Sequence, residues 1–145
     1  MKKQLMIALL TALTMSAEAQ QIMDVHTHII VPEYIELLKA HDAELEETFP
    51  LPQWDVEKHL AFMDSASIRS AILTMPAPQP YFGDTEESSR CIRKVNEISA
   101  KIKRQYPDRF RFCAALPLPD VDAAIREDTR LHIVNRTDVG NTQTE

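Results

Sequence analysis

The chain has 145 residues, of which 44% are hydrophobic and 26% are charged, a composition typical of an ordinary globular domain and not of a disordered segment. Its formal charge at pH 7 is −6, and its two cysteines are too few for a disulfide framework. The acidic balance argues against nucleic acid and against an anionic membrane surface as partners.

The first segment has the three-part layout of a secretory signal peptide. Lys2 and Lys3 precede an apolar run from Leu5 to Met15, and Ala17-Glu18-Ala19 resembles a cleavage site. An uncleaved membrane anchor is the alternative, but the run is shorter than the about 20 residues that cross a bilayer. We therefore expect a signal peptide at residues 1–19 and a mature protein that is periplasmic or secreted. Without Lys2, Lys3 and Glu18 it has 14 basic and 21 acidic residues and a formal charge of −7.

Residues 21–28 form a short β-type run, which we expect to be the first strand. Successive side chains of a strand point to opposite faces, so strict alternation places four residues on one face: Ile22, Asp24, His26 and His28.

Two helices are expected next. Pro32 suits the first turn of a helix that carries apolar residues at helical spacing, and we expect this helix to end near Glu47. The proline-containing segment 48–52 cannot continue it. Asp55 is a good N-cap for a second, shorter helix that turns its apolar residues inward: Val56, Leu60 and Met63.

Two more strand–helix units follow. Residues 69–75 form the second expected strand, which a proline-rich loop at 76–83 ends, and Asp84 caps a long helix. Residues 110–116 form the third strand, and another helix starts at Val121. Strands that alternate with helices predict a parallel sheet, in a single α/β domain.

His26 and His28 are the residues best suited to chemistry. They lie two apart on the first strand, so both imidazoles point to one side and can reach one metal ion from a rigid support. Neutral imidazole is a good ligand for zinc and related divalent ions, and Asp24 could orient a histidine. A His-x-His pattern by itself is also compatible with two ordinary polar residues at a strand end.

Several separated segments resemble the amidohydrolase-related family of metal-dependent hydrolases. Within it, the sequence is most similar to the branch of aminocarboxymuconate-semialdehyde decarboxylase and the aromatic-acid decarboxylases. The resemblance covers about residues 22–127, and Ser67 stands where relatives commonly carry glycine. In chain order it rests on Asp24-Val25-His26-Thr27-His28-Ile29-Ile30, Pro32-Glu33-Tyr34, residues 60–64, Asn96, residues 106–110 and residues 115–119.

The resemblance implies the N-terminal part of a (β/α)₈ TIM barrel, about three βα units, with a divalent metal that is usually zinc. His26 and His28 would be metal ligands, with Asp24 in support, while the family takes a histidine and an aspartate from later strands. The implied reaction on a small-molecule substrate is either hydrolysis of an amide or ester-like bond or loss of carbon dioxide from a carboxylate.

The resemblance divides the chain into a signal peptide (1–19), a partial barrel (20–127) and an unmatched tail (128–145). A complete barrel needs about 250 residues, roughly twice the mature chain. We therefore expect an inactive fragment of an enzyme that lacks the later metal ligands, a role that His41 and His59, on helices, would not fill. The alternative is a small exported, non-catalytic binding or assembly module that self-associates.

Three other features have both a structural and a functional interpretation. Arg109 precedes the third strand, so a structural ion pair is favoured over a contact with a substrate carboxylate. The loop at 76–83 is either a spacer or the border of a pocket, with Tyr81 or Phe82 as a lid. Cys91 and Cys113 fit buried core positions better than a disulfide, although export would permit one.

Overall fold

The computed structural model describes residues 21–46 and 49–140. The predicted signal peptide and the last five residues of the tail lie outside this range. The elements are β1 (Ile22–His28), α2 (Pro32–Ala40), β2 (Leu45–Glu46), β3 (Phe49–Pro50), α3 (Val56–Ser65), β4 (Ile68–Thr74), α4 (Thr85–Gln105), β5 (Phe110–Phe112) and α5 (Val121–Gly140). Within the described range, no helix has the length and apolar character needed to span a membrane.

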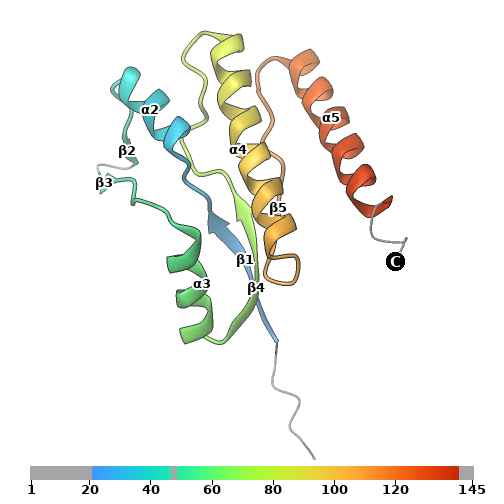
Figure 1. The fold of residues 1–145 in the computed structure, drawn as a ribbon. Helices are drawn as coiled ribbons and strands as arrows, with labels where there is room; N and C mark the ends of the chain where they lie inside the picture. The colour runs from blue at the N-terminus through green and yellow to red at the C-terminus, as the bar shows by residue number, and fades with distance from the viewer. Residues whose placement is uncertain (1–20, 47–48, 141–145) are drawn as a thin grey trace, which may run out of the picture.

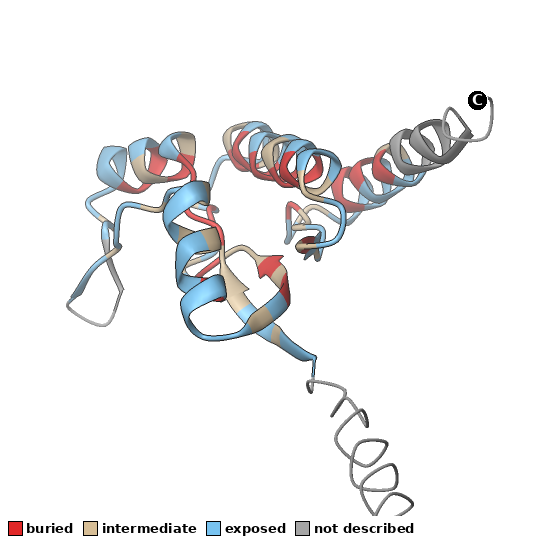
Figure 2. Ribbon diagram, turned by 60° about the horizontal axis from the view of Figure 1, so that its bottom comes forward, coloured by how far each residue is buried: buried red, intermediate tan, exposed pale blue. Residues whose placement is uncertain are grey.

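Strands β1, β4 and β5 form one parallel sheet in the order β1–β4–β5, as the alternation of strands and helices predicts. A separate antiparallel pair, β2 with β3, lies beside it and was not expected from the sequence. The helices run along one side of the sheet (Figures 1 and 2). The structure therefore has the mixed α/β layering expected for part of a barrel, with one face of the sheet covered and the other open in the described residues.

The core lies on the covered face, between the strands and the helices. Ala71 and Leu73 of β4 and Phe110 of β5 are 1%, 1% and 0% exposed, and they pack under α3 and α4. Met63 of α3 and Val95 of α4 close this core from the helix side, at the inward positions that the helical spacing predicts.

The predicted caps are confirmed. The Asp55 carboxylate accepts a hydrogen bond from the Lys58 amide at 2.9 Å, and the Asp84 carboxylate accepts from the amides of Glu86 and Glu87 at 2.8 and 3.0 Å. These bonds lower the pKa of Asp84, because they favour its charged form.

The predicted end of the helix that starts at Pro32 was wrong. We expected it near Glu47, but α2 ends at Ala40 and the chain turns at Asp42, which has a left-handed φ of 51°. Aspartate tolerates this conformation better than most residues, so it can stop a helix much as glycine does. Leu45 then enters the β2–β3 pair instead of the helical face.

One more boundary differs from the sequence prediction. The third strand is shorter than expected, Phe110–Phe112 instead of 110–116. Helix α5 runs from Val121 to Gly140 and so continues past Glu127, where the family resemblance ends. Leu131, in the predicted tail, is 4% exposed, so at least this part of the tail joins the helical layer.

A buried polar contact holds α4, α5 and the segment after β5 together. Asn96 is 1% exposed; its amide donates to the Ala115 carbonyl and to Glu127 Oε1, both at 2.9 Å, and its oxygen accepts from the Ala115 amide. Burial raises the pKa of Glu127, but the hydrogen bonds from Arg130 and Asn96 outweigh it and hold the pKa below its usual value. The hydrogen bonds that Arg130 and Asn96 donate to Glu127 thus favour its charged form.

Candidate metal centre

His26 and His28 are close to the carboxyl end of β1. This end of the strand leads toward α2 (Figure 1). The ring centroids of the two histidines are 5.0 Å apart and the rings meet edge to face at 76°. His26 is exposed and His28 is half-buried. In a parallel α/β sheet the carboxyl ends of the strands carry the functional groups, so the pair occupies a favourable position for a site.

A β-bulge changes the face on which Asp24 lies. Asp24 pairs with Ala71 and Thr27 pairs with Leu73, so two residues of β1, Val25 and His26, stand opposite one residue of β4. Paired residues of neighbouring strands point to the same side, which puts Asp24 and Thr27 on the helix-covered face. The prediction that Asp24 shares a face with the histidines was therefore wrong, because it assumed unbroken alternation.

Asp24 instead supports the backbone of the site. Its Oδ1 accepts a hydrogen bond from the His26 amide at 3.0 Å, a local turn that stabilises the bulge. Asp24 thus supports the peptide of His26 through this hydrogen bond. His26 and His28 stay on the open face, as their ring contact shows.

The partner of a histidine ring comes from β4 and was not identified from the sequence. Thr74, paired with His28, places its Oγ1 3.0 Å from His28 Nδ1 and donates to the Thr27 carbonyl at 3.1 Å. The available signal was weak: Thr74 lies one residue before the end of the second predicted strand, and in a parallel sheet that end lies next to the end of the first strand.

His59 lies on the covered face and belongs to a different environment. The Trp54 indole donates to His59 Nδ1 at 3.1 Å, and the His59 ring stands edge to face against Phe110. Burial lowers the pKa of His59, and the nearby Asp24 carboxylate offsets part of that effect. His59 is therefore a packing histidine, as expected from its helix position.

The donor set at the pair fits a divalent metal in part. The two imidazoles stand next to each other on an open face, and the Thr74 contact leaves Nε2 of His28 available to bind. Within residues 21–46 and 49–140, no group of three or more His, Cys, Asp or Glu side chains is placed to hold a metal. The described residues could thus supply two nitrogen ligands, whereas a metal site normally needs at least three protein ligands.

The structure decides one of the alternatives left open by the sequence and bears on a second. Arg109 forms an ion pair with Asp64 at 2.7 Å, the structural role that was favoured. The loop at 76–83 packs on the end of α2, where Phe82 stacks on His41 with ring centroids 4.3 Å apart, which supports the spacer interpretation.

Both cysteines are free, so the described structure contains no disulfide between them. Cys91 is buried as predicted, and burial raises the pKa of its thiol to about 12. Cys113 is exposed, so the core prediction was wrong for it, because β5 ends before this residue.

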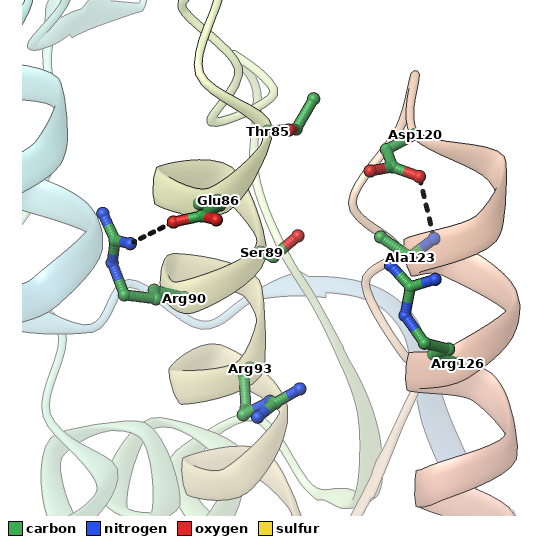
Figure 3. A pocket seen from close by; sticks show the side chains of 8 residues that line it. All are labelled: Thr85, Glu86, Ser89, Arg90, Arg93, Asp120, Ala123 and Arg126. Carbon is green, nitrogen blue, oxygen red and sulfur yellow. Dashed lines mark hydrogen bonds and ion pairs between the residues drawn. The ribbon is translucent and has the colours of Figure 1, made fainter.

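Two cavities lie away from the histidines. A hollow of about 290 Å³ between α4 and α5 has polar walls (Figure 3). There Arg90 is 3.7 Å from Glu86, and Asp120 caps α5 by accepting from the Ala123 amide at 2.9 Å. A larger one of about 580 Å³ lies between α2 and the β2–β3 segment and is lined in part by Ile30 and Trp54. Neither contains a histidine.

The chain is similar to known decarboxylases in sequence. Decarboxylase yanB of Aspergillus niger is 38% identical over 109 residues, which make up 72% of this chain and 29% of that protein. Gamma-resorcylate decarboxylase of Rhodococcus jostii is 39% identical over 69 residues, 47% of this chain and 21% of that protein. The chain thus spans less than a third of the length of the curated relatives it matches. No protein-family model matches it.

Solved structures give the same picture. An amidohydrolase II superposes with a TM-score of 0.73 at 31% identity, over 77% of this chain and 36% of that protein. 2,6-Dihydroxybenzoate decarboxylase from Rhizobium superposes with a TM-score of 0.59 at 28% identity, over 77% and 35%. A dihydroxybenzoic acid decarboxylase from Polaromonas, with bound manganese and 2-nitroresorcinol, shares the fold at 24% identity with a TM-score of 0.59, over 77% and 35%. The homologues of this chain are thus decarboxylases of the amidohydrolase-related family, and the chain corresponds to the N-terminal part of their barrel.

Proposed function

We propose that this chain is the N-terminal part of a metal-dependent decarboxylase that acts on a small carboxylate substrate. The observation that carries the proposal is the His26–His28 pair at the carboxyl end of β1, in a chain whose homologues are decarboxylases. Aromatic hydroxy acids are the first substrates to test, because two of the similar proteins are named for them. Hydrolysis of an amide or ester-like bond is the second candidate, favoured by the similar amidohydrolase II.

His26 and His28 would hold the metal, and the remaining ligands would come from residues beyond the described ones. Zinc suits neutral imidazole nitrogen, whereas manganese, present in one similar structure, prefers oxygen ligands. When bound, the metal would supply positive charge that polarises a substrate oxygen. Two imidazoles alone hold a divalent ion weakly, so we expect weak metal binding and no turnover from the 145-residue chain by itself.

Metal binding is tested on the untagged chain with Zn²⁺ and Mn²⁺, by competition with a coloured chelator. We expect the double variant His26→Ala/His28→Ala to lose the binding that the wild type shows. The control is His41→Ala/His132→Ala, which removes two histidines outside the pair and should keep it. Equal binding by wild type and the His26/His28 variant would overturn the assignment of the site.

The reaction is tested by release of carbon dioxide from 2,6-dihydroxybenzoate. We expect metal-dependent release by the longest product of the same gene locus and none by the 145-residue chain. Cleavage of amide or ester substrates without carbon dioxide release would favour the hydrolase. A chain that forms a defined dimer and ignores both metals would favour the non-catalytic module instead.

A further inference from the structure

Thr74 is bonded to three consecutive residues at the end of β1 and just after it, Thr27, His28 and Ile29. Its backbone carbonyl accepts from the Ile29 amide at 2.9 Å, its hydroxyl donates to the Thr27 carbonyl at 3.1 Å, and the same oxygen lies 3.0 Å from His28 Nδ1. The residue is half-buried at the end of β4 and pairs with His28 in the sheet register. Its hydroxyl therefore has little freedom to change partners.

The direction of the contact with His28 follows from counting protons. A threonine hydroxyl has one proton and two lone pairs, and a backbone carbonyl can only accept. Because Thr74 donates its proton to the Thr27 carbonyl, it can only accept from the imidazole. The proton of a neutral His28 ring must then be on Nδ1, and Nε2 carries the free lone pair.

We propose that Thr74 is a positioning residue that fixes His28 as the Nδ1–H tautomer and presents Nε2 as its metal-binding atom. The metal part of this inference rests on the proposed function, but the tautomer does not. Groups that accept the second ring N–H of a metal-bound histidine hold the ring in place, and their loss typically weakens metal binding 10- to 100-fold. Sequence reasoning gave this orienting role to Asp24, which the bulge turns to the other face.

His59 provides an internal reference with the opposite tautomer. The Trp54 indole nitrogen can only donate, so His59 Nδ1 must accept, and the proton of the neutral ring must be on Nε2. Nε2 of His59 lies 3.4 Å from Thr27 Oγ1, which can accept that proton. One chain thus contains two histidines whose tautomers are set in opposite directions by two different neighbours.

The test is ¹⁵N NMR of the metal-free chain at pH 8.5, where a histidine of ordinary pKa, about 6.5, is neutral. Nδ1 and Nε2 have distinct shifts in the two tautomers. We expect the Nδ1–H pattern for His28 and the Nε2–H pattern for His59. A His28 ring that is mainly Nε2–H in the wild type would overturn the inference, and this measurement needs no variant.

Two variants separate positioning from simple packing. Thr74→Val keeps the shape but removes the acceptor, so His28 should become a mixture of tautomers and zinc binding should weaken about tenfold. Thr74→Ser restores the hydroxyl and should recover both readouts, while His59 stays unchanged in both variants. A Thr74→Val protein with an unaltered His28 pattern would refute the role. Correct tautomers with no loss of metal on His28→Ala would leave the tautomer assignment standing, but would overturn its metal part together with the proposed metal site.

Discussion

The two faces of the parallel sheet differ in what covers them. On one face Leu73 and Phe110 are 1% and 0% exposed beneath the helices, and even a histidine there, His59, is held by an indole and an aromatic ring. On the other face Val25 is 65% exposed and His26 lies open. The same strands thus contribute to the hydrophobic core on one face and carry the candidate metal ligands on the other. Strands of barrel enzymes typically combine these two roles.

The largest test of this difference compares two apolar truncations in the sheet. Leu73→Ala, on the covered face, should cost about 3 kcal/mol of unfolding free energy, because it leaves a cavity in the core. Val25→Ala, on the open face, should change it by less than about 0.5 kcal/mol. Urea unfolding of both variants measures the contrast. A comparable loss in Val25→Ala would mean that another molecule covers the open face in solution.

A smaller effect is expected at the turn that leads into β4. Ser67 has a left-handed φ of 57°, a conformation that glycine adopts more readily than serine. The left-handed conformation destabilises the folded state by about 1–2 kcal/mol for a residue with a side chain. Glycine avoids this cost, but its greater freedom in the unfolded chain offsets about 0.5–1 kcal/mol of the gain. Ser67→Gly should therefore stabilise the chain by roughly 0.5–1 kcal/mol.

The control for this substitution is Ser65→Gly. Ser65 is also exposed but lies in the last turn of α3, where glycine should destabilise the helix. The two variants should shift the urea midpoint in opposite directions. Shifts of the same sign would contradict the strain assigned to Ser67.

The smallest effect concerns pH and His59. Burial lowers the pKa of the folded ring below its ordinary value of 6.5. As the pH falls through that value, the unfolded ring takes up a proton before the folded ring does, so stability decreases. The contribution of a neutral His59 to stability is fully present above the ordinary pKa of the unfolded ring. It is lost as the pH falls toward the lowered pKa of the folded ring.

The measurement is the slope of unfolding free energy against pH just below the ordinary histidine pKa. His59→Gln should flatten this slope, whereas His132→Gln, which changes an exposed histidine of α5, should leave it almost unchanged. An NMR titration reads the His59 pKa directly. A pKa at or above the ordinary value would contradict a buried, neutral ring on the covered face.

The alternation of three strands with helices, the caps at Asp55 and Asp84 and the His26–His28 pair could be predicted from the sequence, whereas the β2–β3 pair could not. The predicted features depend on residues that are close together in the sequence, so local sequence patterns are enough to predict them. The family resemblance agrees with the decarboxylase homologues and the barrel fold, while the metal, the export and the domain boundaries stay predictions.

The face of Asp24, the partner of His28 and the short end of α2 were decided only by the tertiary structure. Each depends on how distant segments meet: a bulge appears only when β1 is paired with β4, and Thr74 reaches His28 across 46 positions of sequence. The alternation of residues within one strand does not reveal a β-bulge, because the extra residue is defined only by the pairing with the neighbouring strand. The sequence by itself determined which residues could hold a metal, and the sheet decided which of their neighbours orients them.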